Sequence, residues 1–208
     1  RNTSLVILAL LLTSPVASAM EEHLDKAVDV IRDVADQIPA SALAEARAVV
    51  LVKVTRGGFG IGGQLGEGVV IQRQGNGWSA PVAFETGGGS IGFQIGLESI
   101  GYGYLLNTEA AVEMFTSTSE VTFDASANAT AGPNRAAADS RTDLPASPIF
   151  AYTTSDGAFA GASVGGSYLE VEADVNEAFY GSDQTTSEIL AMPASAAPEG
   201  ARGIYEIL

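Results

Sequence analysis

The first part of the chain changes from helical to strand-like spacing of its apolar residues. Between residues 21 and 38, apolar side chains recur at steps of three and four with charged residues between them, which predicts an amphipathic helix. Pro39 ends this helix, because proline disfavours helical geometry at the residue before it. Ser41 can cap a second, shorter helix that runs to about Arg47. The β-branched run at 49–54 then predicts a strand.

A glycine-rich block follows, in which apolar and aromatic residues stand at nearly alternate positions. From Gly57 to Gly103, 16 of 47 residues are glycine. The pattern predicts strands separated by tight turns, with residues 74–77 as a hairpin turn. Glycine within strands indicates bulges or sharp bends, which a strongly curved sheet requires. The expected strands are about 58–64, 67–74, 78–86, 90–98 and 100–107.

The rest of the chain returns to the sheet and then to helices. The expected elements are a short helix at Thr108–Phe115 capped by Thr108 or Asn107, a strand at 120–131, a loop at 132–148, strands at 149–154 and 158–171, helices at 174–180 and 185–191, and a C-terminal tail at 192–208. This order is typical of α+β folds rather than of alternating βαβ units. The predicted fold class is therefore α+β, with N-terminal helices followed by a strongly curved, mainly antiparallel, glycine-rich β-sheet or barrel-like sheet with short helices.

The N-terminus has the pattern of a secretory signal. An apolar run near ten residues, 4–13, is followed by Pro15 and by Ala17-Ser18-Ala19. The run is shorter than the roughly 20 residues of a membrane-spanning helix, and the small-residue triplet is typical of signal-peptidase sites. We expect a signal peptide at 1–19 and a single domain over 20–191; a buried N-terminal helix is the alternative. No cysteine follows the run, so we expect a periplasmic or secreted protein without a lipoprotein anchor.

Composition narrows the chemistry further. The 208 residues include 10 Lys+Arg and 25 Asp+Glu, a formal net charge of −15, so nucleic acid is not an expected partner. Apolar residues make up 46% and charged residues 17%, a balance that favours a folded domain over disorder. The chain has no cysteine and one histidine, which excludes thiolate nucleophiles, Cys-ligated zinc and His pairs. We expect neither a metal nor a cofactor.

Individual motifs give little support for catalysis. Residues 58–63 match G-x-G-x-x-G, but the glycines that follow disfavour the helix that a dinucleotide site requires, so we interpret them as sheet curvature. His23, the one candidate base for a serine nucleophile, is expected on the solvated side of the leading helix. Carboxylates in and beside the glycine-rich strands, Glu67, Glu85 and Glu98, leave a hydrolase as an alternative.

Several blocks of sequence together resemble the SYLF domain family. They fall in order across residues 39–190. Among them are Gly66-Glu67-Gly68-Val69-Val70 with Arg73, Gly77-Trp78-Ser79-Ala80-Pro81, Gly92-Phe93-Gln94-Ile95-Gly96-Leu97-Glu98, Tyr152-Thr153-Thr154-Ser155-Asp156-Gly157, and Asn176 with Phe179-Tyr180-Gly181. The resemblance implies one domain without known enzymatic activity, which binds membrane lipids in eukaryotic members and contributes to actin organisation in some.

From this resemblance we expect an exported, non-enzymatic lipid- or envelope-binding module. A protein–protein interaction scaffold of the envelope is an alternative, and no actin partner is expected if the protein is bacterial. The candidate lipid or ligand contacts are Arg56, Arg73, Trp78, Gln94, Glu98 and Arg135. For Trp78, a core anchor is the favoured reading and an indole that faces lipid or ligand is the alternative.

The leading helix is a further candidate for lipid contact. In the family, a basic leading segment is credited with phosphoinositide binding, whereas this helix is acidic with only Lys26 and Arg32 as cations. If the helix contacts lipid, its apolar residues Leu24, Val28, Ile31 and Ala35 insert into the interface. In the alternative, the same residues pack on the sheet.

Overall fold

Three very long antiparallel strands dominate the molecule. The computed structural model describes residues 15–116, 120–131, 134–136, 149–182 and 184–208. Within them lie β1 (Ala48–Gln74), β3 (Val82–Leu106) and β6 (Ile149–Val171). The expected division of the glycine-rich block into five shorter strands is therefore wrong, as is the break within β6. Glycine here lets the chain bend while the ladder of hydrogen bonds continues, so the bends do not end the strands.

The sheet is antiparallel throughout, in the order β2-β1-β3-β6-β4. The short strand β2 (Gly77–Trp78) follows the hairpin turn predicted at 74–77, where Gly75 has a φ of 52°. At the other edge β4 (Glu120–Ala131) and β5 (Asn134–Ala136) both pair with β6. β5 falls inside the expected loop; the rest of 132–148 lies outside the described residues. The α+β class is confirmed, and among the described strands no pairing closes the sheet into a barrel.

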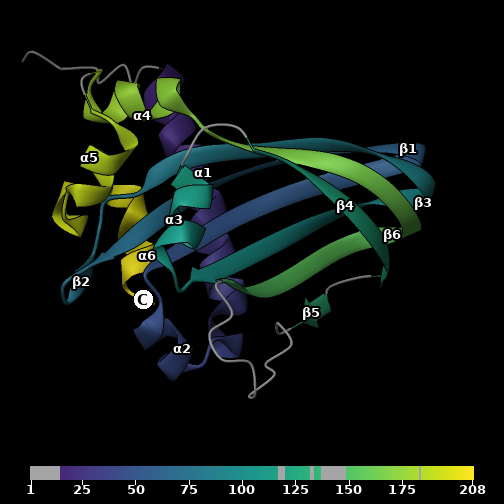
Figure 1. Cartoon of the computed structure of the whole chain (residues 1–208), viewed down its shortest axis with the longest axis horizontal. Coiled ribbons are helices and arrows are strands. Elements are labelled where there is room, and N and C mark those ends of the chain that lie inside the picture. The colour runs from purple at the N-terminus through teal and green to yellow at the C-terminus, as the bar shows by residue number, and fades with distance from the viewer. Residues whose placement is uncertain (1–14, 117–119, 132–133, 137–148, 183) are drawn as a thin grey trace, which may run out of the picture.

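The middle of the β1–β3 ladder is sharply bent. The register shifts between Phe59 and Ile61, around Gly60, whose φ of 74° favours glycine. A Cβ on Gly68 would lie 2.1 Å from the carbonyl oxygen of Leu51, so glycine allows the two halves of β1 to pass in backbone contact. We call residues 57–66 of β1 and 86–97 of β3 the bend. The helices gather toward the opposite end of the sheet and leave the bend uncovered (Figure 1).

The helices largely follow the sequence predictions. They are α1 (Pro15–Val34), α2 (Ala40–Glu45), α3 (Glu109–Thr116), α4 (Ala173–Tyr180), α5 (Thr186–Ala191) and α6 (Arg202–Tyr205), with 3-10 turns η1 (Ala35–Gln37), η2 (Ala194–Ala196) and η3 (Glu199–Ala201). The predicted cap is confirmed at Thr108, whose Oγ1 accepts from the Ala111 N–H at 3.1 Å. α1 begins before the predicted start at residue 21 and gives way to η1 after Val34, before Pro39.

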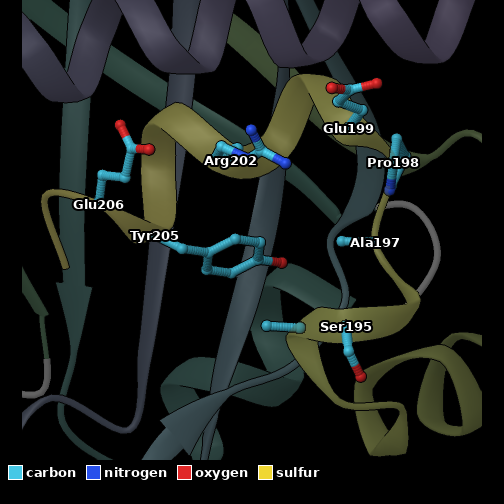
Figure 2. A pocket seen from close by; sticks show the side chains of 8 residues that line it. Ser195, Ala197, Pro198, Glu199, Arg202, Tyr205 and Glu206 are labelled. Carbon is cyan, nitrogen blue, oxygen red and sulfur yellow. The ribbon is translucent and has the colours of Figure 1, made fainter.

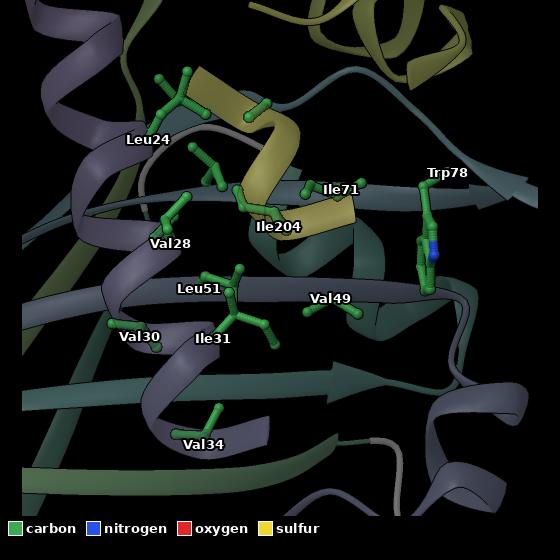
Figure 3. Close-up of a cluster of buried hydrophobic side chains, with 14 of the residues drawn as sticks. Leu24, Val28, Val30, Ile31, Val34, Val49, Leu51, Ile71, Trp78 and Ile204 are labelled. Carbon is green, nitrogen blue, oxygen red and sulfur yellow. The ribbon is translucent and has the colours of Figure 1, made fainter. Parts of the chain in front are cut away.

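The apolar side of α1 packs on one face of the sheet, as one of the two sequence readings predicted. Leu24 and Ile31 have no exposed surface and lie in one cluster with Leu51 and Ile71 (Figure 3). This face carries the odd-numbered side chains of β1 and β3. The even-numbered side chains form a second cluster with α3 and α5. Packing on both faces therefore fixes the helical end of the sheet.

Both ends of the described chain contact this body. Residues 192–208, expected as a tail, form short helical turns, and Ile204 is fully buried beside α1 (Figure 3). At the other end, Ala19 packs against the core and Met20 is fully buried within α1. The signal peptide stays a prediction. If it is cleaved after Ala19, Met20 becomes the first residue.

Candidate functional site

Three of the six predicted contact residues, at even-numbered positions, lie on the inner side of the strands in the bend or at its border. Arg56 of β1 and Glu98 of β3 are directly opposite each other, and the Arg56 Nε–H donates to Glu98 Oε1. The Glu98 side chain has no exposed surface and that of Arg56 has 18%. Gln94 is also buried, and its Nε2 donates to the Ser90 carbonyl oxygen at 3.2 Å. The inner side of the bend is therefore polar, and a buried ion pair lies at its border.

The outer side of the bend carries large apolar side chains that face solvent. They come from odd-numbered positions of both strands, the same face that α1 covers farther along. We call them the bend surface, which consists of Phe59, Ile61, Leu65, Ile91, Phe93, Ile95 and Leu97. Phe93 is 94% exposed and Ile95, the least exposed, 58%. Proteins that remain in water rarely expose a contiguous apolar patch of this kind without a function for it.

The polarity of the bend is thus the reverse of that at the helical end. Near the helices, both faces of the strands are apolar and buried. In the bend, glycine and glutamine lie inside, with the Arg56–Glu98 ion pair at its border, and phenylalanine, isoleucine and leucine lie outside. Residues 57–66 and 86–97 contain no charged residue, in a chain of net charge −15. The bend is therefore the uncharged part of an acidic molecule.

The remaining predicted contact residues lie elsewhere. Arg73 and Trp78 face each other across β1 and β2, with the Arg73 guanidinium 4.1 Å from the centre of the indole ring. Arg73 also donates to the carbonyl oxygens of Ala46 and Leu43, at 2.8 and 2.6 Å. Trp78 is 9% exposed within the α1 cluster, as a core anchor would be. Arg135 lies on β5 opposite Thr154 of β6.

The Trp78 block is held in place by hydrogen bonds from distant elements. The Tyr205 hydroxyl donates to the Ser79 carbonyl oxygen at 2.7 Å, and the Tyr180 hydroxyl donates to that of Pro81 at 2.8 Å. Burial raises the pKa of both tyrosines above the ordinary value, so their hydroxyls stay protonated as donors at neutral pH. The Trp-Ser-Ala-Pro motif thus anchors α4 and α6 to the sheet.

The carboxylates that suggested a hydrolase lie in ion pairs or in a row across the sheet. Glu67 and Glu85 are opposite each other at the border of the bend, and Glu85 is opposite Glu170. Lys26 of α1 contacts Glu67 and, at 2.9 Å, Glu22. Burial lowers the pKa of Lys26, but the hydrogen bonds to the two carboxylates outweigh it and leave the pKa raised. In the described part of the chain, no group of three or more His, Asp or Glu side chains is arranged to hold a metal ion.

His23 is buried, whereas the sequence predicted a solvated position. It is 2% exposed rather than solvated, because α1 docks against the end of β6. Its Nε2 lies 2.8 Å from Glu172 Oε1 and its Nδ1 2.8 Å from the Ala19 carbonyl oxygen. Both partners carry oxygens that can accept a hydrogen bond from the ring. His23 therefore ties α1 to the sheet and is not placed beside a nucleophile.

A surface hollow of about 350 Å³ lies in the C-terminal segment. Its lining comes entirely from residues 194–206, and the Tyr205 ring lies across it (Figure 2). Its two carboxylates, Glu199 and Glu206, stand at opposite ends of the hollow, so they do not face one point as an acid–base pair would. None of the described helices is both long and apolar enough to cross a membrane.

The bend surface was not predicted from the sequence. Its residues alternate with glycine and polar residues, a pattern that ordinarily marks the core face of a strand. The signal that could have identified them is the complete absence of charge from both segments of the bend. A core-facing strand in an acidic protein is expected to carry charges on its solvent side.

Comparison with known proteins places the chain among eukaryotic relatives. A family model described as Las17-binding protein actin regulator, Ysc84, matches residues 87–208. An SH3 domain-containing protein of Schizosaccharomyces pombe is 33% identical over 95% of this chain and 49% of its own length. Protein YSC84 of Saccharomyces cerevisiae is 32% identical over 95% and 45%, and the human SH3 domain-containing YSC84-like protein 1 is 30% identical over 95% and 60%.

The chain thus spans about half the length of the curated relatives that it matches. None of their names is that of an enzyme. No solved structure matches the chain.

Proposed function

The chain belongs to the Ysc84, or SYLF, family, and we propose that it is a non-enzymatic module that binds a lipid bilayer through the bend surface. One observation carries the proposal: seven large apolar side chains are exposed on the outside of a bend that has no charge. A bilayer interface buries apolar side chains and tolerates an uncharged backbone whose hydrogen bonds are satisfied within a sheet.

The free energy available from this surface is large enough for membrane binding. Burial of one exposed Phe, Leu or Ile side chain contributes about 1.5–3 kcal/mol. Phe59 and Phe93 have 83% and 94% of their surface exposed, so most of that contribution is still available to them. Partial insertion of a few of the seven side chains therefore suffices for reversible attachment.

The leading helix does not supply this contact. Its apolar residues are buried against the sheet, so exposing them would require α1 to leave the core. The hydrolase alternative has little support, since Glu98 is buried in an ion pair and Glu67 is paired with Lys26. The family model is described as Las17-binding protein actin regulator, and a Saccharomyces cerevisiae relative is named LAS seventeen-binding protein 3. Neither Las17 nor actin is part of the proposal for this chain.

We further propose that the module acts outside the cytoplasm. The support is the apolar run at 4–13 followed by Ala17-Ser18-Ala19. N-terminal sequencing of the protein recovered from the cell envelope or medium tests this, since export predicts a mature N-terminus at Met20. A chain retained in the cytoplasm with residues 1–19 intact would contradict it.

Vesicle flotation of a matched pair of variants tests the lipid contact. Phe93→Ser removes an apolar side chain from the bend surface and leaves no cavity, so the fold is expected to be unchanged. We expect vesicle affinity to fall by about tenfold, the equivalent of about 1.4 kcal/mol. Phe179→Ser, on α4 away from the bend and 37% exposed, serves as the control and should leave affinity unchanged.

Two results would contradict the proposal. One is that the wild-type protein does not float with vesicles of any composition. The other is equal loss of affinity in the two variants. If wild type instead sediments as a dimer that Phe93→Ser dissociates, the bend surface is a contact between copies of the chain.

A further inference from the structure

We infer that the bilayer recognised by the bend surface is electrically neutral, and that anionic headgroups oppose rather than assist binding. The inference rests on the proposed function and specifies its lipid class. It is carried by the charges that border the bend.

The first border is neutral and buried. Arg56 is the cation nearest in sequence to the bend, and it is the partner of the fully buried Glu98. An arginine in a buried pair cannot reach a lipid phosphate without leaving a carboxylate uncompensated. The interior of the bend therefore offers no cation to an anionic headgroup.

The second border is acidic and lies on the same side as the bend surface. Glu67, Glu85 and Glu170 are directly opposite one another across three neighbouring strands. Residues that face each other in an antiparallel pair lie on one face of the sheet. In the described part of the chain, Lys26 is the cation that contacts this row, and it is shared with Glu22. The row therefore keeps excess negative charge beside the inserting side chains.

Apart from Arg135 on β5, the other described cations lie at the helical end or are already paired. Lys53 is 3.6 Å from Asp29, and Arg47 is 2.9 Å from Glu109. Arg32 and Arg202 belong to α1 and α6 at the helical end. When the bend inserts, the charges that come within a Debye length of the headgroups, about 8 Å at physiological salt, are thus mainly carboxylates.

Flotation of the full chain with two kinds of vesicle tests the inference. One is pure phosphatidylcholine, and the other contains equal parts of phosphatidylcholine and phosphatidylglycerol. We expect the protein to bind the neutral vesicles, and we expect salt not to weaken this binding. Binding to the anionic vesicles should be at least about fivefold weaker at low salt, because the repulsion between one carboxylate and an anionic surface lowers the affinity by about that factor. High salt should restore binding to the anionic vesicles, because it screens the repulsion.

A second matched pair locates the repulsion. Glu85→Gln and Glu113→Gln change the net charge equally, but Glu85 borders the bend and Glu113 is exposed on α3. We expect Glu85→Gln alone to raise affinity for the anionic vesicles, with no change for the neutral ones. Binding that requires phosphatidylglycerol, or binding that is equal for both vesicles, overturns the inference and leaves the proposed function intact. Failure to bind either vesicle removes both.

Discussion

The inner side of the bend is occupied by polar side chains and is not an empty space. Arg56 and Glu98 pair at its border, and Gln94 hydrogen-bonds to Ser90 within it. A Cβ on Gly62 would lie 2.7 Å from Gln94 Nε2, so glycine at 62 makes room for that side chain. Glu98 Oε2 is buried without a hydrogen-bond partner. The apolar side chains of the bend surface lie on the other face of the same strands, so their exposure follows from the alternation of side chains along a strand.

The buried pair gives a prediction about stability. Removing one partner of a buried ion pair typically costs about 3–5 kcal/mol, because the other charge is left uncompensated. We expect Glu98→Gln to lower the free energy of unfolding by about that amount. Glu109→Gln breaks the exposed pair with Arg47 and should cost less than about 1 kcal/mol. Urea unfolding of the two variants measures the difference, and equal losses would contradict the burial of Arg56 with Glu98.

Sequence reasoning at single positions worked at two places where the cause was local, but the cap predicted at Ser41 is wrong, because α2 begins at Ala40 and Ser41 lies inside it. The turn at 74–77 and the cap at Thr108 follow from the preferences of the residues themselves. His23 failed because the partner that buries it, Glu172, is 149 positions away. Trp78 left two readings open for a similar reason, since Arg73 and the α1 cluster decide between them.

Elements with a clear period were predicted well, and glycine-rich elements were not. α1 and α3–α5 appear where apolar spacing and caps placed them. The long strands were divided wrongly, because glycine signals both a turn and a bend within a continuing strand. Figure 1 shows the consequence, in which β1 and β3 extend beyond the helices and curve at the free end.

Two isoleucines separate the roles of α1 and the bend. Ile31 is fully buried under α1, so Ile31→Ala should lower the free energy of unfolding by about 2–5 kcal/mol. Vesicle affinity of the folded protein should not change. Ile91 is 71% exposed in the bend surface, so Ile91→Ala should have the opposite profile, with nearly unchanged stability and weaker vesicle binding. Urea unfolding and flotation of both variants check this, and weaker binding by folded Ile31→Ala would assign lipid contact to α1.

In the whole molecule, charge and apolar surface are separated between the two ends. Helices, ion pairs and the packed core occupy one end, and the uncharged bend occupies the other. The fold class and the family resemblance were accessible from the sequence, since both depend on the order of many short patterns. Which side of the bend faces water was not, because each apolar residue has a glycine next to it in the chain, which leaves either side able to be the interior.

A depth measurement on labelled protein tests the lipid contact most directly. The chain contains no cysteine, so Phe93→Cys and Phe179→Cys each provide a single attachment point for a fluorophore. With phosphatidylcholine vesicles that carry quenchers on their acyl chains, the label at 93 should be quenched and the label at 179 should not. A bound protein whose label at 93 stays unquenched and open to aqueous iodide, or whose label at 179 is quenched instead, would contradict insertion of the bend surface.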